Sequence, residues 1–217
     1  MSVAQLRGMR YPDEYLIRFF YKEDLHRRTG RVLELGCGSA NNLLHFAAYG
    51  WDVVGVDYDA GCVADGRHNL AASNMAGRVI QHDLNTGLPP LTGPFHALLA
   101  PSTLYYLRRE AAWACLRQAA DLLAPGAALY VRMRLPDDHR VGRGTLEGPG
   151  AWRLDTNYTG EKGALNVFWQ EHELLELLHD TLGLPPERLT ILRVAYDNVQ
   201  DGRLIRNSDI VLWGRLP

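Results

Sequence analysis

A glycine-rich turn after an apolar segment is the part of the sequence best suited to bind a ligand. Residues 32–42 read VLELGCGSANN, so a buried strand would run directly into a tight turn, and a helix would follow. Gly36 and Gly38 permit backbone conformations and close approaches that a Cβ would block. Asp57 ends the next apolar segment, about 20 residues later, where a carboxylate can accept hydrogen bonds from the ribose of an adenosine-type cofactor.

Three features favour a cationic sulfonium cofactor over a dinucleotide. The sixth position of the turn, where a dinucleotide site needs glycine to admit the pyrophosphate, is Asn41. Glu34 places a carboxylate at the end of the strand, where it would repel phosphates and attract an ammonium or sulfonium group. Asp83 follows the third expected strand and can accept a hydrogen bond from an adenine amine, while the backbone of Leu84 can meet a ring nitrogen.

The elements around these residues alternate between apolar strands and amphipathic helices. Strands are expected at residues 31–35, 52–56, 78–82, 95–100 and 128–133, with helices at 41–49, 60–72 and 110–124 between them. This order predicts one α/β domain over residues 1–217, with a parallel sheet covered by helices on both faces and a ligand at the carboxyl ends of the strands. A lead helix is expected at 11–25, with Pro12 at its first position.

The last third of the chain contains a long insert and then a hairpin. Residues 134–165 show no helix or strand periodicity, and a compact domain rarely contains such a long irregular segment without a use for it. We interpret this segment as an insert that covers the substrate. A helix at 171–182 and a hairpin of two strands, at 190–196 and 209–214, are expected to complete the fold.

Candidate catalytic residues lie after the fourth strand and in the insert. Tyr105 and Tyr106 should face the reaction site, although each could instead be a core aromatic residue. His139 is a candidate base for an acceptor that keeps its proton, because imidazole titrates near neutral pH, although a loop histidine can also simply be solvated. The three cysteines are far apart, so we expect neither disulfides nor a metal site.

Composition argues against two classes of partner. The formal net charge is −2, which gives none of the positive field needed to bind nucleic acid. The N-terminal residues lack the apolar core of a signal peptide, and no apolar run is long enough to span a membrane. We therefore expect a cytoplasmic protein, a monomer or homodimer, that acts on a small molecule.

Four segments together resemble the motif series of class I S-adenosylmethionine-dependent methyltransferases. They are ELGCG at 34–38, Asp57, the loop at 83–89 and LAPGA at 123–127 before a strand. The resemblance implies a three-layer, doubly wound sheet of seven strands, mostly parallel, with an antiparallel last strand. It also implies that the backbone at Gly36 and Gly38 runs alongside the methionine portion of the cofactor, that Asp57 holds the ribose and that Asp83 with Leu84 binds the adenine. Their neighbours Cys37, Tyr58 and Pro101 are further expected contacts. Ala40 departs from the pattern, because many members have a third glycine there.

Two further segments resemble small bacterial methyltransferases of natural-product or surface-sugar type. They are YPDEY at 11–15, with Arg18 after it, and WQEHEL at 169–174. The resemblance implies that Tyr11, Tyr15 or Arg18 covers the methionine end of the cofactor, with Arg18 able to pair its carboxylate. Alternatively, the lead helix only packs against the core.

The sequence thus favours methyl transfer to an oxygen or nitrogen atom of a small acceptor, such as a sugar or secondary metabolite. Two alternatives remain at this point. An NAD(P)-dependent oxidoreductase would share the glycine turn and Asp57. A non-catalytic partner subunit would bind the same cofactor without transferring the methyl group.

Overall fold

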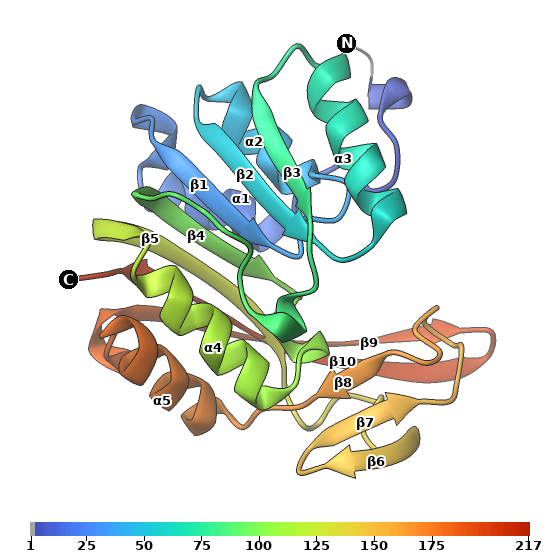
Figure 1. Ribbon diagram of the computed structural model, residues 1–217. Helices are drawn as coiled ribbons and strands as arrows, with labels where there is room; N and C mark the ends of the chain where they lie inside the picture. The colour runs from blue at the N-terminus through green and yellow to red at the C-terminus, as the bar shows by residue number, and fades with distance from the viewer. Residues whose placement is uncertain (1–2) are drawn as a thin grey trace.

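The computed structural model describes residues 3–217, in which seven strands form one twisted sheet (Figure 1). Across the sheet the strands are β3 (Gly77–Gln81), β2 (Asp52–Asp57), β1 (Arg31–Leu35), β4 (Phe95–Pro101), β5 (Leu123–Arg134), β10 (Arg203–Arg215) and β9 (Leu189–Gln200). The α-helices are α1 (Glu14–Lys22), α2 (Asn41–Ala48), α3 (Ala60–Ala72), α4 (Arg109–Ala120) and α5 (Glu171–Leu182). Short 3₁₀ helices are η1 (Val3–Gln5), η2 (Leu25–Arg27), η3 (Leu84–Thr86), η4 (Leu104–Tyr106) and η5 (Pro186–Arg188).

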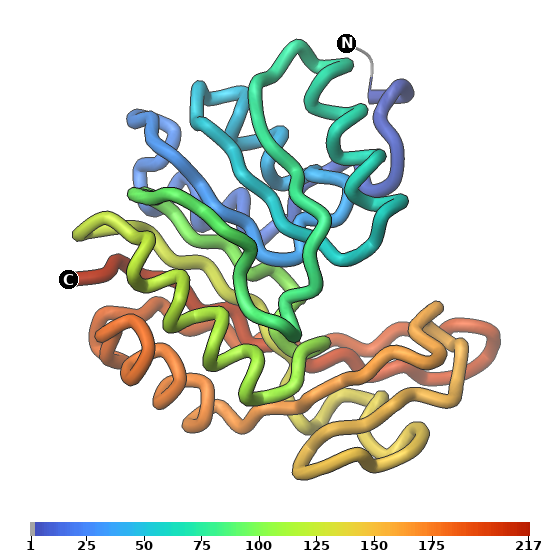
Figure 2. The backbone as a smooth tube through the Cα atoms, in the orientation of Figure 1, coloured from blue at the N-terminus to red at the C-terminus, as the bar shows by residue number. Residues whose placement is uncertain are grey.

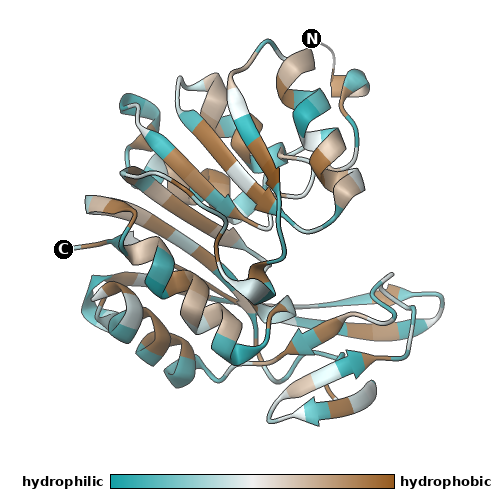
Figure 3. Ribbon diagram, in the orientation of Figure 1, coloured by the Kyte–Doolittle hydropathy of each residue, from teal (hydrophilic) through white to brown (hydrophobic). Residues whose placement is uncertain are grey.

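Both faces of the sheet are buried, which gives the expected three layers. Successive strand residues point to opposite faces: Val32 packs with the apolar residues of α1, α2 and α3, whereas Leu33 packs with those of α4 and α5. The strands are therefore almost continuously apolar, as the brown central strands in Figure 3 show.

The strand directions confirm the predicted topology. Strands β1 to β5 are parallel to one another, and β10 is antiparallel to both β5 and β9. Asp201 and Gly202 join β9 to β10 with positive φ angles of 51° and 72°, as a two-residue hairpin turn requires. The hairpin is longer than expected and extends past the other strands (Figure 2). Its length was underestimated because its outer half is polar and lacks the apolar pattern by which a strand is recognised.

Two predicted helices have wrong boundaries, and the lead helix is wrong at both ends, since it stops at Lys22 rather than at residue 25. The lead helix begins at Glu14 rather than at residue 11, and Pro12 lies before it, because Asp13 is the N-cap and accepts hydrogen bonds from the backbone N–H groups of Tyr15 and Leu16. The helix expected at 110–124 ends at Ala120, and β5 already begins at Leu123.

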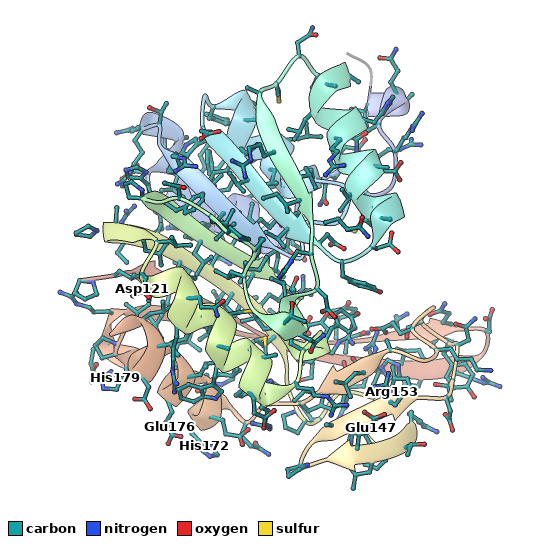
Figure 4. All side chains as sticks on the ribbon, viewed as in Figure 1. Asp121, Glu147, Arg153, His172, Glu176 and His179 are labelled. Carbon is teal, nitrogen blue, oxygen red and sulfur yellow. The ribbon has the colours of Figure 1, made fainter. Side chains whose placement is uncertain are left out.

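The insert expected to be irregular contains a second, three-stranded antiparallel sheet. Its strands are β6 (Gly144–Gly148), β7 (Ala151–Leu154) and β8 (Leu165–Val167). It lies beside the β9–β10 hairpin, and Figure 4 shows Glu147 and Arg153, which form an ion pair, on this sheet. The strands are only three to five residues long, and β6 contains two glycines and a glutamate, so they give no extended apolar alternation of the kind that predicts a strand.

Helix α5 presents three polar side chains to the solvent. His172, Glu176 and His179 point outward from this helix (Figure 4), so they lie on its solvent face.

Within residues 3–217, no helix is both long enough and apolar enough to pass through a bilayer.

Candidate functional site

The glycine turn lies between the end of β1 and the start of α2, and its two glycines have different physical roles. Gly36 has a φ of +68°, and a Cβ there would lie 2.2 Å from Thr103 Oγ1. Gly38 has a φ of +50°, and a Cβ there would meet no atom within 4 Å. Packing against the residues after β4 therefore requires Gly36, whereas Gly38 leaves open space against the main chain.

Alanine substitutions should separate these two roles. We expect Gly36→Ala to lower the free energy of unfolding by about 2 kcal/mol, because the new Cβ is overpacked and the backbone is left-handed. Gly38→Ala should lose less stability, since its Cβ enters open space, and should chiefly weaken cofactor binding. Urea denaturation and calorimetric titration measure the two effects, and Thr103→Ala should partly restore the Gly36→Ala variant. Equal stability losses for the two variants would contradict the assignment.

Ala40 adopts the left-handed conformation that glycine usually provides in this turn. Its φ is +63°, and it precedes the first residue of α2. A Cβ at Gly66 in α3 would lie 3.3 Å from the Ala40 Cβ, so the absence of a side chain at Gly66 makes room for the extra methyl group. The departure from the family pattern is therefore accommodated by α3.

The Asp57 carboxylate at the end of β2 faces this turn. Its Oδ2 accepts a hydrogen bond from the Gly38 N–H at 2.8 Å, and its Oδ1 accepts one from the Asp59 N–H at 3.0 Å. A carboxylate has about four acceptor positions, so both oxygens can still accept from ribose hydroxyls. Tyr58 is 73% exposed beside it.

Glu34 is buried beneath the turn with an incompletely satisfied carboxyl group. It is 0% exposed, Oε1 accepts a hydrogen bond from Asn42 Nδ2 at 2.6 Å, and Oε2 has no partner in the described part of the protein. Burial raises the pKa of Glu34 to about 8, and the negative charge of Asp57 acts in the same direction. An unpaired buried oxygen is costly, and a cationic donor would satisfy it.

The lead segment is joined to Glu34 through residues that the sequence did not single out. The Asp13 N–H donates to Asn42 Oδ1 at 2.9 Å. The Asp13 carboxylate accepts from Tyr130 OH at 2.7 Å and from Arg132 Nη1 at 2.6 Å, and Arg132 also pairs with Asp209. Of these residues, only Asp13 could have been found from its neighbours in the sequence, because aspartate is preferred at the N-cap of a helix. Its other partners are distant in sequence.

The three lead-segment residues predicted to contact the cofactor, Tyr11, Tyr15 and Arg18, have different surroundings in the structure. Tyr15 lies near the network, with Arg132 Cζ 5.6 Å from its ring. Tyr11 is 69% exposed, and its carbonyl accepts from Asn41 Nδ2 at 2.8 Å, so the buried Asn41 side chain fastens the lead segment. Arg18 is exposed on α1 and makes no ion pair with residues 3–217. Contacts of these side chains with a cofactor remain predictions.

On the expected adenine side, Asp83 is the N-cap of η3, and Leu84 is the first residue of that helix. Asp83 Oδ1 accepts from the Asn85 N–H at 2.9 Å and from Asn85 Nδ2 at 3.0 Å, and Asp83 is exposed. Leu84 is 4% exposed. The cap fixes the Asp83 carboxylate at the carboxyl end of β3, in the same edge of the sheet as Asp57.

Two further predicted contacts can offer main-chain groups to a ligand. Cys37 is 2% exposed, and its Sγ packs against Gly55, where a Cβ would be 2.5 Å away. Burial raises the pKa of the Cys37 thiol. Pro101 ends β4, and its carbonyl accepts from Thr103 Oγ1 at 3.2 Å. Only backbone contacts are therefore expected from Cys37.

Tyr105 and Tyr106 follow β4 on η4, next to the insert. Tyr105 is 4% exposed, with Arg134 Cζ 4.2 Å from its ring, and Tyr106 OH donates to Glu161 Oε1 at 2.6 Å. Burial raises the pKa of both phenols. Both therefore stay protonated at neutral pH and can donate hydrogen bonds rather than act as bases.

His139 lies in the first part of the insert, where its backbone N–H donates to the Arg206 carbonyl of β10. Its Nδ1 is 3.0 Å from the Arg206 carbonyl oxygen and 3.4 Å from Asp138 Oδ1. Burial lowers the pKa of His139, and the positive charge of Arg140 lowers it further. The imidazole is therefore neutral at pH 7, and a proton on Nδ1 would leave Nε2 as the basic nitrogen. Its catalytic role remains a prediction.

A pocket of about 230 Å³ lies away from the glycine turn, between the small sheet and the N-termini of α4 and α5. Its lining residues include Arg109, Trp152 and Glu173. Arg109 already forms an ion pair there, with its Nη1 3.1 Å from Glu173 Oε1, and its Cζ lies 4.2 Å from the centroid of the Trp169 ring. We base the site on the glycine turn because the acids and the strand ends meet there.

Comparison with known proteins agrees with this geometry. Residues 32–126, from β1 into β5, match the model of a methyltransferase domain family. A curated relative, the ribosomal RNA small subunit methyltransferase C of Alcanivorax borkumensis, is 27% identical over 107 residues, which are 48% of this chain and 32% of that protein. The chain thus spans about a third of that relative's length.

Solved structures share the fold over nearly the whole chain. A methyltransferase of Methanosarcina mazei described as S-adenosylmethionine-dependent is 17% identical, with a TM-score of 0.68, and the match covers 95% of this chain and 100% of that one. The 1,6-didemethyltoxoflavin N1-methyltransferase of Burkholderia thailandensis is 17% identical, with a TM-score of 0.63 over 94% and 78% of the two chains.

The architecture is the Rossmann-like α/β fold of class I methyltransferases. The match to the methyltransferase domain thus covers residues 32–126, and the solved structures show that the fold extends over nearly the whole chain.

Proposed function

We propose that this protein transfers the methyl group of S-adenosylmethionine to an oxygen or nitrogen atom of a small acceptor, with sugars and secondary metabolites as the favoured classes. The observation that carries the proposal is the buried, unpartnered Glu34 Oε2, on the strand residue two positions before the glycine turn. A buried carboxylate is satisfied by a cationic ligand and repels a pyrophosphate. Because burial raises the pKa of Glu34 to about 8, a bound cation would favour its ionisation and a bound pyrophosphate would oppose it, which argues against the oxidoreductase alternative.

The residues present fit the cofactor. Glu34 would hold its cationic methionine end, Gly36 and Gly38 would let it lie against the main chain, and Asp57 would accept from the ribose hydroxyls. Asp83 and the backbone of Leu84 would bind the adenine. When bound, the cofactor supplies an electrophilic methyl group on a positively charged sulfur.

The contribution of the chain to transfer is mainly positioning. Aligning an acceptor with the methyl group can lower the barrier by roughly 7–11 kcal/mol, through entropy already lost on binding. Tyr105 and Tyr106, as protonated phenols, would orient the acceptor from η4, and the insert would exclude water. His139, neutral at pH 7, is the candidate base for a hydroxyl acceptor.

A small acceptor is supported by the charge of the chain and by one structural neighbour. The formal net charge is −2, and the neighbouring Burkholderia enzyme was crystallised with a small heterocyclic acceptor and S-adenosylhomocysteine. The relative that methylates ribosomal RNA matches less than half of this chain. Methylation of ribosomal RNA without turnover of any small molecule would overturn this part of the proposal.

Calorimetric titration tests the cofactor. We expect S-adenosylmethionine and S-adenosylhomocysteine to bind and NADH not to bind. Asp57→Asn keeps the Asp59 or Gly38 hydrogen bond through its remaining oxygen but loses the charged acceptor, so affinity should fall at least tenfold, roughly the 1.5–3 kcal/mol of a charged hydrogen bond. Asp197→Asn, on the exposed hairpin, is the matched control and should bind as the wild type does. Binding of NADH in place of the sulfonium would refute the proposal.

A further inference from the structure

A second carboxylate, that of Glu161, lies where the insert meets β5 and η4, and its side chain is 13% exposed. Glu161 Oε1 accepts hydrogen bonds from Tyr106 OH at 2.6 Å and from Arg134 Nη1 at 2.7 Å. Its Oε2 accepts from Arg140 Nε at 2.5 Å and from Thr159 Oγ1 at 2.6 Å. Four donors around one carboxylate form a complete binding site for that group. Burial opposes ionisation, but Arg134 and the hydrogen bonds outweigh it and lower the pKa of Glu161 to about 2.

Tyr106 and Arg134 belong to regular elements of the main fold, whereas Glu161 belongs to a connecting loop that also contains its fourth donor, Thr159. Arg134 is the last residue of β5 and is 8% exposed, and Tyr106 ends η4. Arg140 is 7% exposed and is also held by Asp138, at 3.0 and 3.1 Å. Glu161 lies in residues 155–164, which contain turns but no helix or strand. The guanidinium groups therefore have other anchors, and the carboxylate is the component most easily moved.

Asn166 gives an independent indication of a ligand at this place. Its side chain is 0% exposed, and its Oδ1 accepts a hydrogen bond from Arg134. The amide nitrogen, Nδ2, is buried and has no partner in the described part of the protein. A buried donor without an acceptor is costly. An acceptor atom of a ligand bound beside Arg134 would satisfy it.

The carboxylate site is close to the glycine turn. The Thr103 side chain fills the space that a Cβ on Gly36 would need. The Tyr106 N–H donates to the Thr103 carbonyl at 2.9 Å, so Tyr106 is one 3₁₀ turn farther on, a rise of roughly 6 Å. A small molecule bound at Tyr106 and Arg134 can therefore extend toward the expected position of the methyl group.

Resting on the proposed function, we propose that the methyl acceptor carries a carboxylate that replaces Glu161 between Tyr106, Arg134 and Arg140. Glu161 occupies the site in the ligand-free protein and moves out with its loop when the acceptor enters. The exchange of one carboxylate for another leaves the two guanidinium groups neutralised, so no buried charge is left unpaired. Asn166 Nδ2 adds a donor for a second oxygen of the acceptor.

Glu161→Ala empties the site and makes it accessible to a small anion. We expect sodium formate to raise the melting temperature of Glu161→Ala by at least about 3 °C more than sodium chloride at equal ionic strength, because formate binds only the folded state. Glu147→Ala is the matched control, since it removes a carboxylate from an Arg pair in the same insert without touching Tyr106. It should respond to the two salts equally, as should the wild type. An equal response of Glu161→Ala to both salts would refute the proposal and leave Glu161 as a latch that only holds the insert.

A measurement on the wild-type protein covers the case in which Glu161→Ala does not fold. Hydroxybenzoates should bind at least tenfold more tightly than the corresponding hydroxybenzamides, which have the same shape but no carboxylate. Equal binding of acids and amides would overturn the inference. Titration with S-adenosylmethionine distinguishes the two proposals: if the cofactor does not bind, the proposed function fails, whereas cofactor binding without selectivity for carboxylates refutes only the carboxylate site.

Discussion

Asp13→Ala should lower the free energy of unfolding by about 3 kcal/mol, one of the largest single losses expected in this protein. The substitution removes the N-cap of α1, for which about 1 kcal/mol is typical. It also removes the carboxylate that Tyr130 and Arg132 share at 2.7 and 2.6 Å, and it leaves Arg132 with Asp209 as its remaining charged partner. Breaking a largely buried pair from one side is costly. For a domain of this size we expect the melting temperature to fall by roughly 6–12 °C, measured by calorimetry.

An exposed aspartate provides the control for this prediction. Asp197 pairs with Arg206 at 3.3 Å, and its side chain is 41% exposed, so Asp197→Ala should cost less than about 1 kcal/mol. Asp13→Asn should lie between the two, because its amide oxygen can still cap the helix although the charge is lost. Similar losses for Asp13→Ala and Asp197→Ala would show that the network around Arg132 contributes little.

Affinity for S-adenosylmethionine should rise with pH through about 8, because Glu34 must lose its proton to face a cation. The pKa of Glu34 is raised to about 8 by burial, so the carboxyl group is mostly protonated at pH 6. Below this pKa, each pH unit adds about 1.4 kcal/mol to the cost of ionising it. We therefore expect roughly tenfold weaker binding per unit below pH 8 and a proton released on binding, detected by calorimetry in buffers of different ionisation enthalpy.

Glu34→Gln isolates the effect of this residue from the titration of the cofactor's own amino group. The variant should bind S-adenosylmethionine weakly, and its affinity should not show the increase with pH that the ionisation of Glu34 causes in the wild type. The raised pKa also implies that Glu34 stabilises the ligand-free protein most below its unfolded value, near 4.5, and that this contribution is lost as the pH rises through about 8. The melting temperature of the wild type should therefore fall more steeply than that of Glu34→Gln over this range. Parallel pH profiles for the two proteins would contradict the assignment.

Local sequence patterns predicted the main strands, the helices and the glycine turn. The apolar periodicity predicted the β1 to β5 strands and their helices, and the glycines with Asp57 predicted the turn that the structure shows. These features are readable because a strand, a helix and a tight turn each depend on neighbouring residues. The insert was missed in part, because β6, β7 and β8 are short and pair without apolar alternation.

Only the tertiary structure decided which side chains support that turn. Arg132 meets Asp13, 119 positions away, because β5 passes beneath α1, and it meets Asp209 because β10 pairs with β5 in a register that places Asp209 opposite Arg134. The Glu161 site likewise unites η4, β5 and a loop of the insert. Such contacts depend on strand register and on how the insert folds back, and neither leaves a signal in the spacing of residues along the chain.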